Sequence, residues 1–320
     1  MSPKSVIGRF APTPSGEIHL GNAFAALLAW LSARSQGGRI VLRVEDLDLA
    51  RTSPTYTQGF VQTMDWLGLD WDEGPDKDGP HTPYLQSQRG NYYTGLLTQL
   101  QNNGLVYPCF CSRAQLHAAT APHASDGIYL YNGHCRNLSA NAIKSLSQTR
   151  PPAYRIQVPD ETISFIDKCQ GHYRQNLAAE CGDYIVRRSD GVWAYQLAAP
   201  ADDAAMGITE VVRGKDLLSS TPRQIWLLQT LGLPVPSFAH CPLLLAPDGR
   251  RLSKRDGDIS LQSFSAKGVS PQALTGLLAW LGGLLPNFQP ISPTNLLPYF
   301  SWAKIKQNDI CLPLNFLSFL

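Results

Sequence analysis

The chain has 320 residues, of which 43% are hydrophobic and 16% charged, enough apolar sequence for one large or two modest globular domains. This composition excludes a disordered chain, and a net charge of only +2 gives no general signal for binding a polyanion. The N-terminus lacks the apolar core of a signal peptide, and no run is long enough to span a membrane, so we expect a cytoplasmic protein without a membrane partner.

The first predicted elements are a short apolar strand over 6–10, a loop and a helix. Prolines and Gly16 force the loop, and the alanine- and leucine-rich run over 23–33 has helical spacing. A helix that begins directly after a strand offers the unpaired N–H groups of its first turn to an anion, with phosphate as the leading candidate. The loop contains neither GxGxxG nor GxxxxGK[ST], which argues against hydride transfer and P-loop hydrolysis.

His19 and Gly21 stand where this helix begins. An imidazole there can donate a hydrogen bond to a phosphate, and glycine lets a nucleotide approach the backbone. Taken alone, His19 is more simply interpreted as a surface residue at a helix cap.

A buried strand is predicted over 38–44, and Glu45 follows it. In open α/β sheets the carboxyl end of a strand faces the ligand crevice, although a lone acidic residue there is more often a cap or a solvated loop residue. Two helices then form scaffold, one from Ser53–Pro54 to Gly68 and one over 88–102.

Cys109 and Cys111 are one residue apart, and Cys135 follows further along. Seven cysteines, an odd number in a chain without a secretory signal, favour thiols or a metal over disulfides. Three thiolates leave one position of a tetrahedral metal site open. His134 is the default fourth ligand on general grounds, but it directly precedes Cys135, which makes chelation by both side chains awkward. Buried unpaired cysteines are the alternative, and we prefer that interpretation for the other four: Cys169, Cys181, Cys241 and Cys311.

In the second half, residues 184–187 are predicted to return to the parallel sheet. The Asp190–Gly191 dipeptide then predicts a hairpin turn into a strand over 192–198. Another strand over 208–212 leads to Arg213, and a helix follows from Thr221–Pro222 to Gly232.

A strand-like run over 239–246 and an Asp248–Gly249 turn lead into a strongly cationic loop that contains Lys254. After Asp256 the pattern predicts two or three helices, one that begins at Ser270–Pro271 and another over 294–305.

His19-Leu20-Gly21-Asn22 and Arg251-Leu252-Ser253-Lys254-Arg255 together resemble the paired HIGH and KMSKS signatures of class I aminoacyl-tRNA synthetases. The segments 9–16, 42–48 and 211–217 resemble signatures of the glutamyl and glutaminyl branch. The resemblance covers about residues 5–260. It implies an α/β fold with a Rossmann-type parallel sheet, a zinc-containing insertion and a short helical C-terminal region.

The resemblance divides the chain into four predicted regions. Residues 1–108 and 183–256 are the halves of the catalytic domain, the second with the KMSKS-like loop. Residues 109–182 form the inserted zinc-binding module, which faces the tRNA acceptor end in most class I synthetases, and 257–320 form the helical region.

The resemblance also implies a site for L-glutamate and for ATP with Mg²⁺. The residues that the resemblance implies for binding glutamate are Arg9, Phe10, Ala11, Pro12, Thr13, Glu45, Tyr195 and Arg213. Those that it implies for binding ATP are His19, Gly21, Asn22, Ser253 and Lys254, with His19 and Lys254 also as catalytic residues. Arginine suits a substrate with two carboxylates because its planar guanidinium binds a carboxylate through two parallel hydrogen bonds. Which of Arg9 and Arg213 binds which carboxylate stays open.

Bacterial glutamyl-type synthetases with a Cys-x-Cys…Tyr-x3-Cys pattern bind a structural zinc through the tyrosine oxygen. The resemblance therefore implies Zn²⁺ on Cys109, Cys111, Tyr131 and Cys135. The long stretch between Cys111 and Tyr131, with His117 and His123 in it, departs from the compact form of this pattern.

Ordinary members continue into a large anticodon-binding region, whereas this sequence ends soon after Lys254. It resembles truncated members that activate glutamate as glutamyl-adenylate and attach it to queuosine in the anticodon loop of tRNA(Asp). We expect a monomer that binds this stem-loop. A conventional glutamyl-tRNA synthetase core and a catalytically silent RNA-binding paralogue are the alternatives, and intact His19, Lys254, Arg9, Glu45 and Arg213 argue against the silent one.

Overall fold

The computed structural model describes four stretches of the chain: residues 5–77, 79–112, 130–252 and 260–320.

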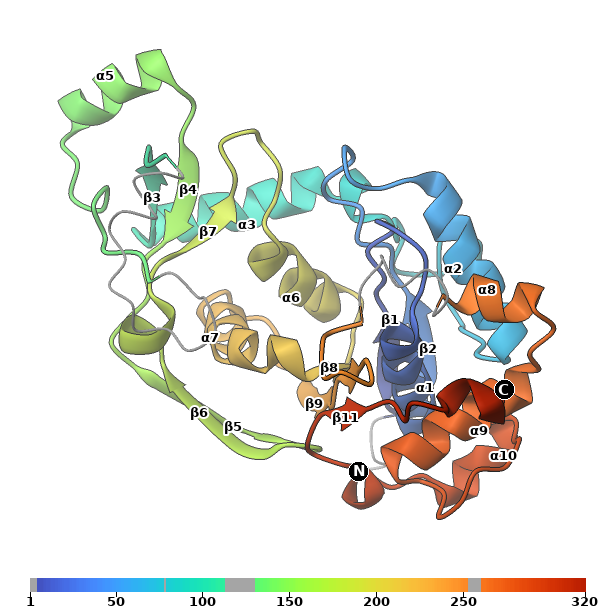
Figure 1. The fold of residues 1–320 in the computed structure, drawn as a ribbon. Coiled ribbons are helices and arrows are strands. Elements are labelled where there is room, and N and C mark those ends of the chain that lie inside the picture. The colour runs from blue at the N-terminus through green and yellow to red at the C-terminus, as the bar shows by residue number, and fades with distance from the viewer. Residues whose placement is uncertain (1–4, 78, 113–129, 253–259) are drawn as a thin grey trace.

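The centre of the fold is the parallel pair of strands β1 (Ile7–Phe10) and β2 (Arg39–Leu42), joined by helix α1 (Leu20–Arg34) (Figure 1). On its other side β1 lies beside β8 (Glu210–Gly214). The backbone N–H of Thr209, the residue before β8, donates to the carbonyl of Ile7 in β1 at 2.9 Å. β8 pairs in parallel with β9 (Ser237–Cys241). The predicted α/β core with parallel strands is confirmed.

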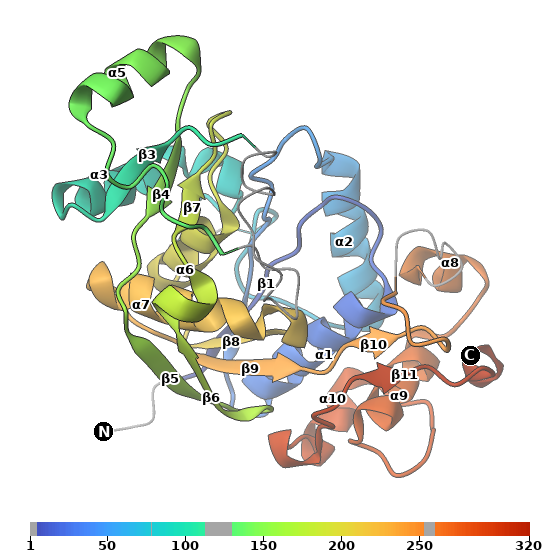
Figure 2. The same cartoon turned by 60° about the vertical axis from the view of Figure 1, so that its left-hand side comes forward.

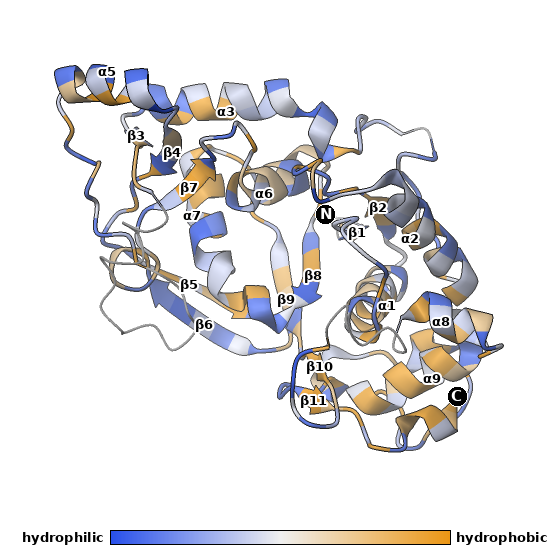
Figure 3. Cartoon of the chain, turned by 45° about the horizontal axis from the view of Figure 1, so that its top comes forward, coloured by the Kyte–Doolittle hydropathy of each residue, from blue (hydrophilic) through white to orange (hydrophobic). Residues whose placement is uncertain are grey.

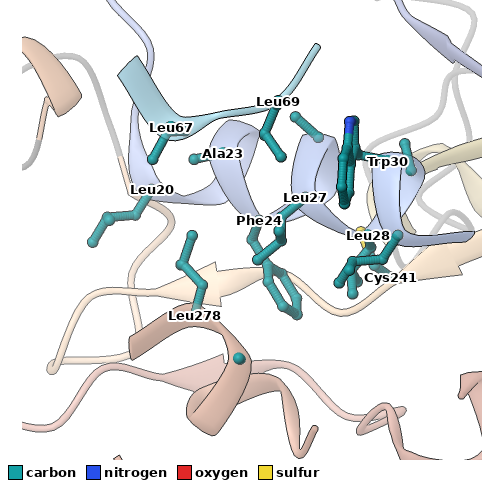
Figure 4. Close-up of a cluster of buried hydrophobic side chains, with 14 of the residues drawn as sticks. Leu20, Ala23, Phe24, Leu27, Leu28, Trp30, Leu67, Leu69, Cys241 and Leu278 are labelled. Atoms are coloured by element: carbon teal, nitrogen blue, oxygen red, sulfur yellow. The ribbon is translucent and has the colours of Figure 1, made fainter. Parts of the chain in front are cut away.

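Helix α1 is apolar on most sides and is buried along nearly all of its length. Figure 4 shows Leu67 and Leu69 on one side of it and Leu278 of α9 (Pro271–Gly282) on the opposite side, near Phe24. The fit is close, because a Cβ at Gly282 would lie 2.8 Å from the Phe24 ring. Helix α9, coloured predominantly hydrophobic in Figure 3, thus completes the core beneath α1.

The predicted scaffold helices are present as α2 (Pro54–Leu67) and α3 (Gly90–Asn102). The Ser53 side chain accepts the N–H of Thr55 at the start of α2, and Gly68 ends the helix with a φ of 74°. Short 3-10 turns and one π turn complete the helical segments of these stretches: Gln86–Gln88, Lys215–Ser220, Leu297–Tyr299, Trp302–Lys304 and Phe316–Phe319, with the π turn at Leu177–Cys181. Within the described residues, no helix combines the length and the apolar character needed to cross a bilayer.

A second sheet is antiparallel and consists of β3 (Val106–Cys109), β4 (Ala153–Ile156) and β7 (Tyr184–Arg187). The prediction that residues 184–187 rejoin the parallel sheet is therefore wrong. Their backbone groups pair with β4, where Tyr184 lies opposite Ile156. Helix α5 (Ala140–Thr149) lies beyond this sheet, far from the C-terminal helices, and buries none of its residues (Figures 1 and 2).

The hairpin of β5 (Thr162–Asp167) and β6 (Gly171–Asn176) extends the core sheet instead. Its contact is a parallel bridge between Asp167 and Phe238 of β9. Part of the segment expected to form an insertion therefore builds the edge of the nucleotide fold.

The predicted strand over 192–198 is wrong. The Asp190–Gly191 turn does form, and Trp193 still bridges to Arg187, but helix α6 (Tyr195–Ala205) begins directly afterwards. The local alternation of apolar residues stops at Ala198, and the alanine-rich continuation is helical. The buried Asp202 and Asp203 of α6 pair with Arg89 and Arg43, which favours this helix. A short window of sequence does not contain these distant partners.

The remaining elements lie in the second half of the chain: α7 (Thr221–Thr230), β10 (Leu244–Leu245), α8 (Leu261–Ala266), α10 (Pro293–Leu296) and β11 (Ile310–Cys311). Helix α7 begins at Thr221 as predicted, and Ser270 caps α9.

Two predictions for the C-terminal part need correction. A single helix over 294–305 does not form, because Pro298 stands two residues after the end of α10 and the chain continues in short 3-10 turns. Cys311 is exposed rather than buried, in a strand that pairs in parallel with β10.

Candidate active site

A cavity of about 610 Å³ opens at the carboxyl ends of β1 and β8 and at the start of α1. It brings together the predicted residues that the structure describes: Arg9, Phe10, Ala11, Pro12, Thr13, His19, Gly21, Asn22, Glu45, Tyr195 and Arg213. Ser253 and Lys254 lie outside the described residues. Arg251 and Leu252, which directly precede them, line the cavity.

Glu45 and Arg43 form a buried ion pair at the end of β2. The Arg43 guanidinium has no exposed surface; its Nη2 lies 3.1 Å from Glu45 Oε1 and its Nη1 lies 2.7 Å from Asp203 Oδ1. Burial raises the pKa of Glu45 above its ordinary value, against the attraction of Arg43 and Arg9. A substrate ammonium group beside Glu45 would add the positive charge that favours its ionised form.

Arg9 also lines the cavity and is already partly neutralised. Its Nη1 donates to the carbonyl of Val212 at 2.7 Å, and its Nε lies 3.4 Å from Asp203 Oδ1. Asp203 of α6 thus contacts both Arg9 and Arg43. Sequence analysis assigned no role to Asp203 or Arg43. The signal available in the sequence was an arginine directly after an apolar strand, and the structure shows that it is fully buried.

Arg213, at the end of β8, is held by neutral groups. Its Nη1 donates to Tyr195 Oη at 3.1 Å, its Nη2 to Thr221 Oγ1 at 2.8 Å and its Nε to His240 Nε2 at 3.0 Å. Within the described stretches, Arg213 makes no ion pair with a carboxylate. Its charge is therefore left for an anion in the cavity.

His19 caps α1, as the simpler sequence interpretation suggested. Its Nδ1 accepts the N–H of Gly21 at 3.1 Å, and the N–H groups of Asn22 and Ala23 donate to its carbonyl. The prediction that the first turn offers unpaired N–H groups is thus wrong at these three positions. Because Nδ1 accepts, a neutral imidazole carries its proton on Nε2, where it can donate to a phosphate.

The catalytic role that the family resemblance implies for His19 predicts that Gly21→Ala lowers the rate of adenylate formation roughly tenfold without unfolding the chain, because small misplacements of a catalytic group are costly. A Cβ at this position would lie 3.1 Å from Cε1 of His19, so the ring must shift by a few tenths of an ångström. Glutamate-dependent pyrophosphate exchange and thermal melting measure the two effects.

Gly95→Ala is the matched control, since a Cβ at Gly95 in α3 meets nothing within 4 Å. It should raise stability by about 0.5–1 kcal/mol and leave exchange unchanged. Equal exchange rates in both variants would contradict the role given to the His19 ring position.

The sulfur atoms of Cys109, Cys111 and Cys135 lie within 4.8 Å of one another. Cys111 Sγ is 3.6 Å from Cys135 Sγ, and Tyr131 Oη is 3.6 Å from the sulfur atoms of both Cys109 and Cys111. Tetrahedral zinc with Zn–S bonds of about 2.3 Å places its sulfur ligands about 3.8 Å apart, close to these distances. His134 is exposed and outside the group. The cluster therefore fits a metal ion, with Tyr131 beside it.

Neighbouring groups prepare Cys109 for an ion, whereas burial raises the pKa of Cys111 to about 11. Arg155 Nε donates to Cys109 Sγ at 3.3 Å, and its guanidinium lies 3.9 Å from the centre of the Tyr131 ring. Burial alone would raise the pKa of the Cys109 thiol, but hydrogen bonds from the Cys111 backbone, Tyr131 and Arg155 lower it below its ordinary value. A thiolate, the form that binds metal, is thereby favoured.

Residues 5–289 match the family model of tRNA synthetases class I (E and Q), catalytic domain. The protein named Glutamyl-Q tRNA(Asp) synthetase of Symbiobacterium thermophilum is 51% identical over 310 residues, which are 96% of this chain and 95% of that protein. Glutamate–tRNA ligase 2 of Acidithiobacillus ferrooxidans is 45% identical over 86% of this chain and 57% of its own length.

Among solved structures, the glutamate-tRNA synthetase of Elizabethkingia anophelis superposes with a TM-score of 0.85 at 28% identity, over 98% of this chain and 69% of that one. The cavity described above is lined by His19, Gly21, Asn22, Arg251 and Leu252, which belong to the two motifs that resemble this family. The chain therefore belongs to the class I tRNA synthetases for glutamate and glutamine, and it is a ligase.

Proposed function

We propose that this chain activates L-glutamate with ATP and transfers the glutamyl group to queuosine in the anticodon loop of tRNA(Asp). The observation that carries the proposal is 51% identity across nearly the whole length of a Glutamyl-Q tRNA(Asp) synthetase. The cavity supports it, because a glutamate molecule carries one ammonium and two carboxylate groups, and the walls offer Glu45, Arg9 and Arg213.

In this proposal the glutamate ammonium lies beside Glu45. Arg213 has no carboxylate partner among the described residues and binds one substrate carboxylate, with the Tyr195 hydroxyl next to it. Arg9 shares its charge with Asp203 and contacts the other. The backbone from Phe10 to Thr13 lines the pocket between these groups.

The first step is an in-line attack of the glutamate α-carboxylate oxygen on the α-phosphorus of ATP. A carboxylate O–P bond forms and the bond to pyrophosphate breaks, which leaves glutamyl-adenylate. Positioning and charge stabilisation supply most of the catalysis. His19 Nε2–H and the ammonium of Lys254 contact the phosphates, Gly21, Asn22 and Ser253 contribute to the ATP site, and Mg²⁺ offsets the phosphate charge.

In the second step a hydroxyl of queuosine attacks the carbonyl carbon of glutamyl-adenylate. An ester bond forms, the mixed anhydride breaks, and AMP leaves with the bond electrons. The hydroxyl proton passes to solvent or to a phosphate oxygen of AMP. We also propose that the enzyme acts as a monomer on the anticodon stem-loop.

We propose a structural Zn²⁺ on Cys109, Cys111, Tyr131 and Cys135. A closed set of four ligands leaves no position for an activated water, so the ion would hold the surrounding segment together. We retain the regions 1–108, 109–182, 183–256 and 257–320 as proposed domains, with β5 and β6 lending the second region its contact to the core sheet.

The test is transfer of labelled glutamate, with ATP, onto queuosine-containing tRNA(Asp), the same tRNA without queuosine, and tRNA(Glu). Label on the first RNA alone is expected, and Glu45→Gln should abolish it. Label on tRNA(Glu) alone would favour a conventional glutamyl-tRNA synthetase, which the identity to Glutamate–tRNA ligase 2 makes the second candidate. No label and no pyrophosphate exchange would overturn both.

A further inference from the structure

A buried aspartate–histidine pair adjoins Arg213 without lining the cavity. Asp167 ends β5 and His240 lies in β9, and neither side chain has exposed surface. Their contact, Asp167 Oδ2 to His240 Nδ1, is 2.6 Å. The carboxylate also accepts the backbone N–H groups of Cys169, Gln170 and His240 at 2.8–3.1 Å, so its position is fixed from several directions.

These contacts determine where the His240 proton resides. Burial alone would raise the pKa of Asp167, but the hydrogen bonds from His240 and Gln170 lower it, which keeps the carboxylate ionised. Burial lowers the pKa of His240, which favours its neutral form. With Nδ1–H donating to Asp167, Nε2 of the neutral ring keeps its lone pair. That lone pair accepts Arg213 Nε–H at 3.0 Å.

Thr221 Oγ1 also lies 3.0 Å from Nε2, so in the opposite tautomer Nε2–H would face the Thr221 hydroxyl as well as Arg213 Nε–H. Because Asp167 takes the Nδ1 proton, the pair selects the ring state that accepts from Arg213. A guanidinium has five N–H donors in one plane. His240, Thr221 and Tyr195 each accept one of them. Among the described residues, one N–H on each terminal nitrogen has no such acceptor, and a pair of guanidinium N–H groups can bind the two oxygens of a carboxylate.

We propose that Asp167 and His240 are positioning residues that orient the Arg213 guanidinium so that its terminal N–H groups meet a carboxylate of glutamate. This inference rests on the proposed function. It assigns the pair to recognition of the amino acid, and not to the binding of ATP. If the pair only stabilised the core, its loss would not affect glutamate binding more than ATP binding.

The test separates the two bonds of His240. His240→Asn keeps a donor near Asp167 and removes the acceptor for Arg213 Nε–H, whereas His240→Gln places an amide oxygen at about the reach of Nε2. In pyrophosphate exchange, His240→Asn and Asp167→Asn should raise the KM for glutamate roughly 10- to 100-fold with an unchanged KM for ATP. His240→Gln should recover most of the loss, and titration calorimetry with glutamate alone should show the same order.

A second histidine–carboxylate pair provides the matched control. His81 Nδ1 lies 2.7 Å from Glu73 Oε2, and neither residue lines the cavity. His81→Asn should therefore leave both KM values unchanged.

An unchanged KM for glutamate in a folded His240→Asn variant would overturn the inference. Parallel rises in both KM values, or failure of His240→Asn and Asp167→Asn alike to fold, would assign the pair a purely structural role and overturn it as well. Absence of glutamate-dependent exchange in the unaltered enzyme would instead refute the proposed function.

Discussion

Arg43→Met is expected to lower the free energy of unfolding by about 3–5 kcal/mol, the cost of removing one partner from a buried ion pair. The guanidinium is completely buried between Asp203 and Glu45. Although burial opposes a charged guanidinium, the attraction of Asp203 and Glu45 raises the pKa of Arg43 above its ordinary value. Without Arg43, Arg9 is the cation that remains near the two buried carboxylates within the described part of the chain. Urea unfolding followed by circular dichroism measures the change.

Arg39→Met is the matched control, since Arg39 begins β2 and Arg43 directly follows it. Arg39 also pairs with a carboxylate, Glu73, at 2.7 Å, but its side chain is 47% exposed. Its loss should cost about 1 kcal/mol or less, as for other solvent-screened pairs. A similar cost for both variants would contradict the burial argument.

A double variant tests the coupling directly. Arg43→Met combined with Asp203→Leu removes a cation and an anion together, so its cost should be smaller than the sum of the single costs. Strict additivity would show that the contact between these residues carries little energy. In pyrophosphate exchange, Arg43→Met should also raise the KM for glutamate, because Glu45 loses its closest cation.

Elements with local signals were predictable from the sequence. Helix α2 is one example: Ser53 and Pro54 mark its start, Gly68 marks its end, and all three act through bonds within a few residues. The residues from 192 to 198 show the opposite case. Their helix is favoured by contacts of Asp203 with Arg43, 160 positions away in sequence, and no local window contains that partner.

In the candidate site, too, some residues were predictable from the sequence and others were not. Arg9, Glu45, Tyr195 and Arg213 follow from the family motifs, and the structure gathers them around one cavity. The groups that hold them, Asp203 and His240 among them, stand in segments without a motif. A charged or titratable residue within an apolar strand, such as His240 in β9, was the one available signal, and only the fold reveals what it contacts.

Cys135→Ala is expected to abolish retention of zinc, whereas the unaltered chain should hold one zinc ion, measured by atomic spectroscopy after dialysis. The variant leaves Cys109, Cys111 and the Tyr131 oxygen, a weaker set with an open position. Tyr131→Phe should still bind zinc, with an affinity lower by roughly 10- to 100-fold. Cys311→Ser is the control, because this exposed thiol lies outside the cluster and its loss should leave zinc bound.

The structural consequence should be local, because metal binding and folding are coupled only where the ligands lie. Helix α5, which follows Cys135, buries none of its residues, so packing alone does little to hold it. Arg150, just after this helix, donates to the carbonyl of Cys111 at 2.9 Å and ties the segment to the cluster. Hydrogen exchange should therefore quicken over 106–112 and 130–152 in Cys135→Ala and remain slow in β1 and β8.

Loss of zinc should affect the two steps of the reaction differently. Pyrophosphate exchange depends on the cavity at the carboxyl ends of β1 and β8, and should persist in the zinc-free variant. Transfer of glutamate to tRNA should fall, because the family resemblance implies that the inserted module faces the tRNA. Equal losses in both steps would show that the module also supports the cavity. An unaltered chain that carries no zinc and melts at the same temperature with or without added zinc would contradict the proposed metal site.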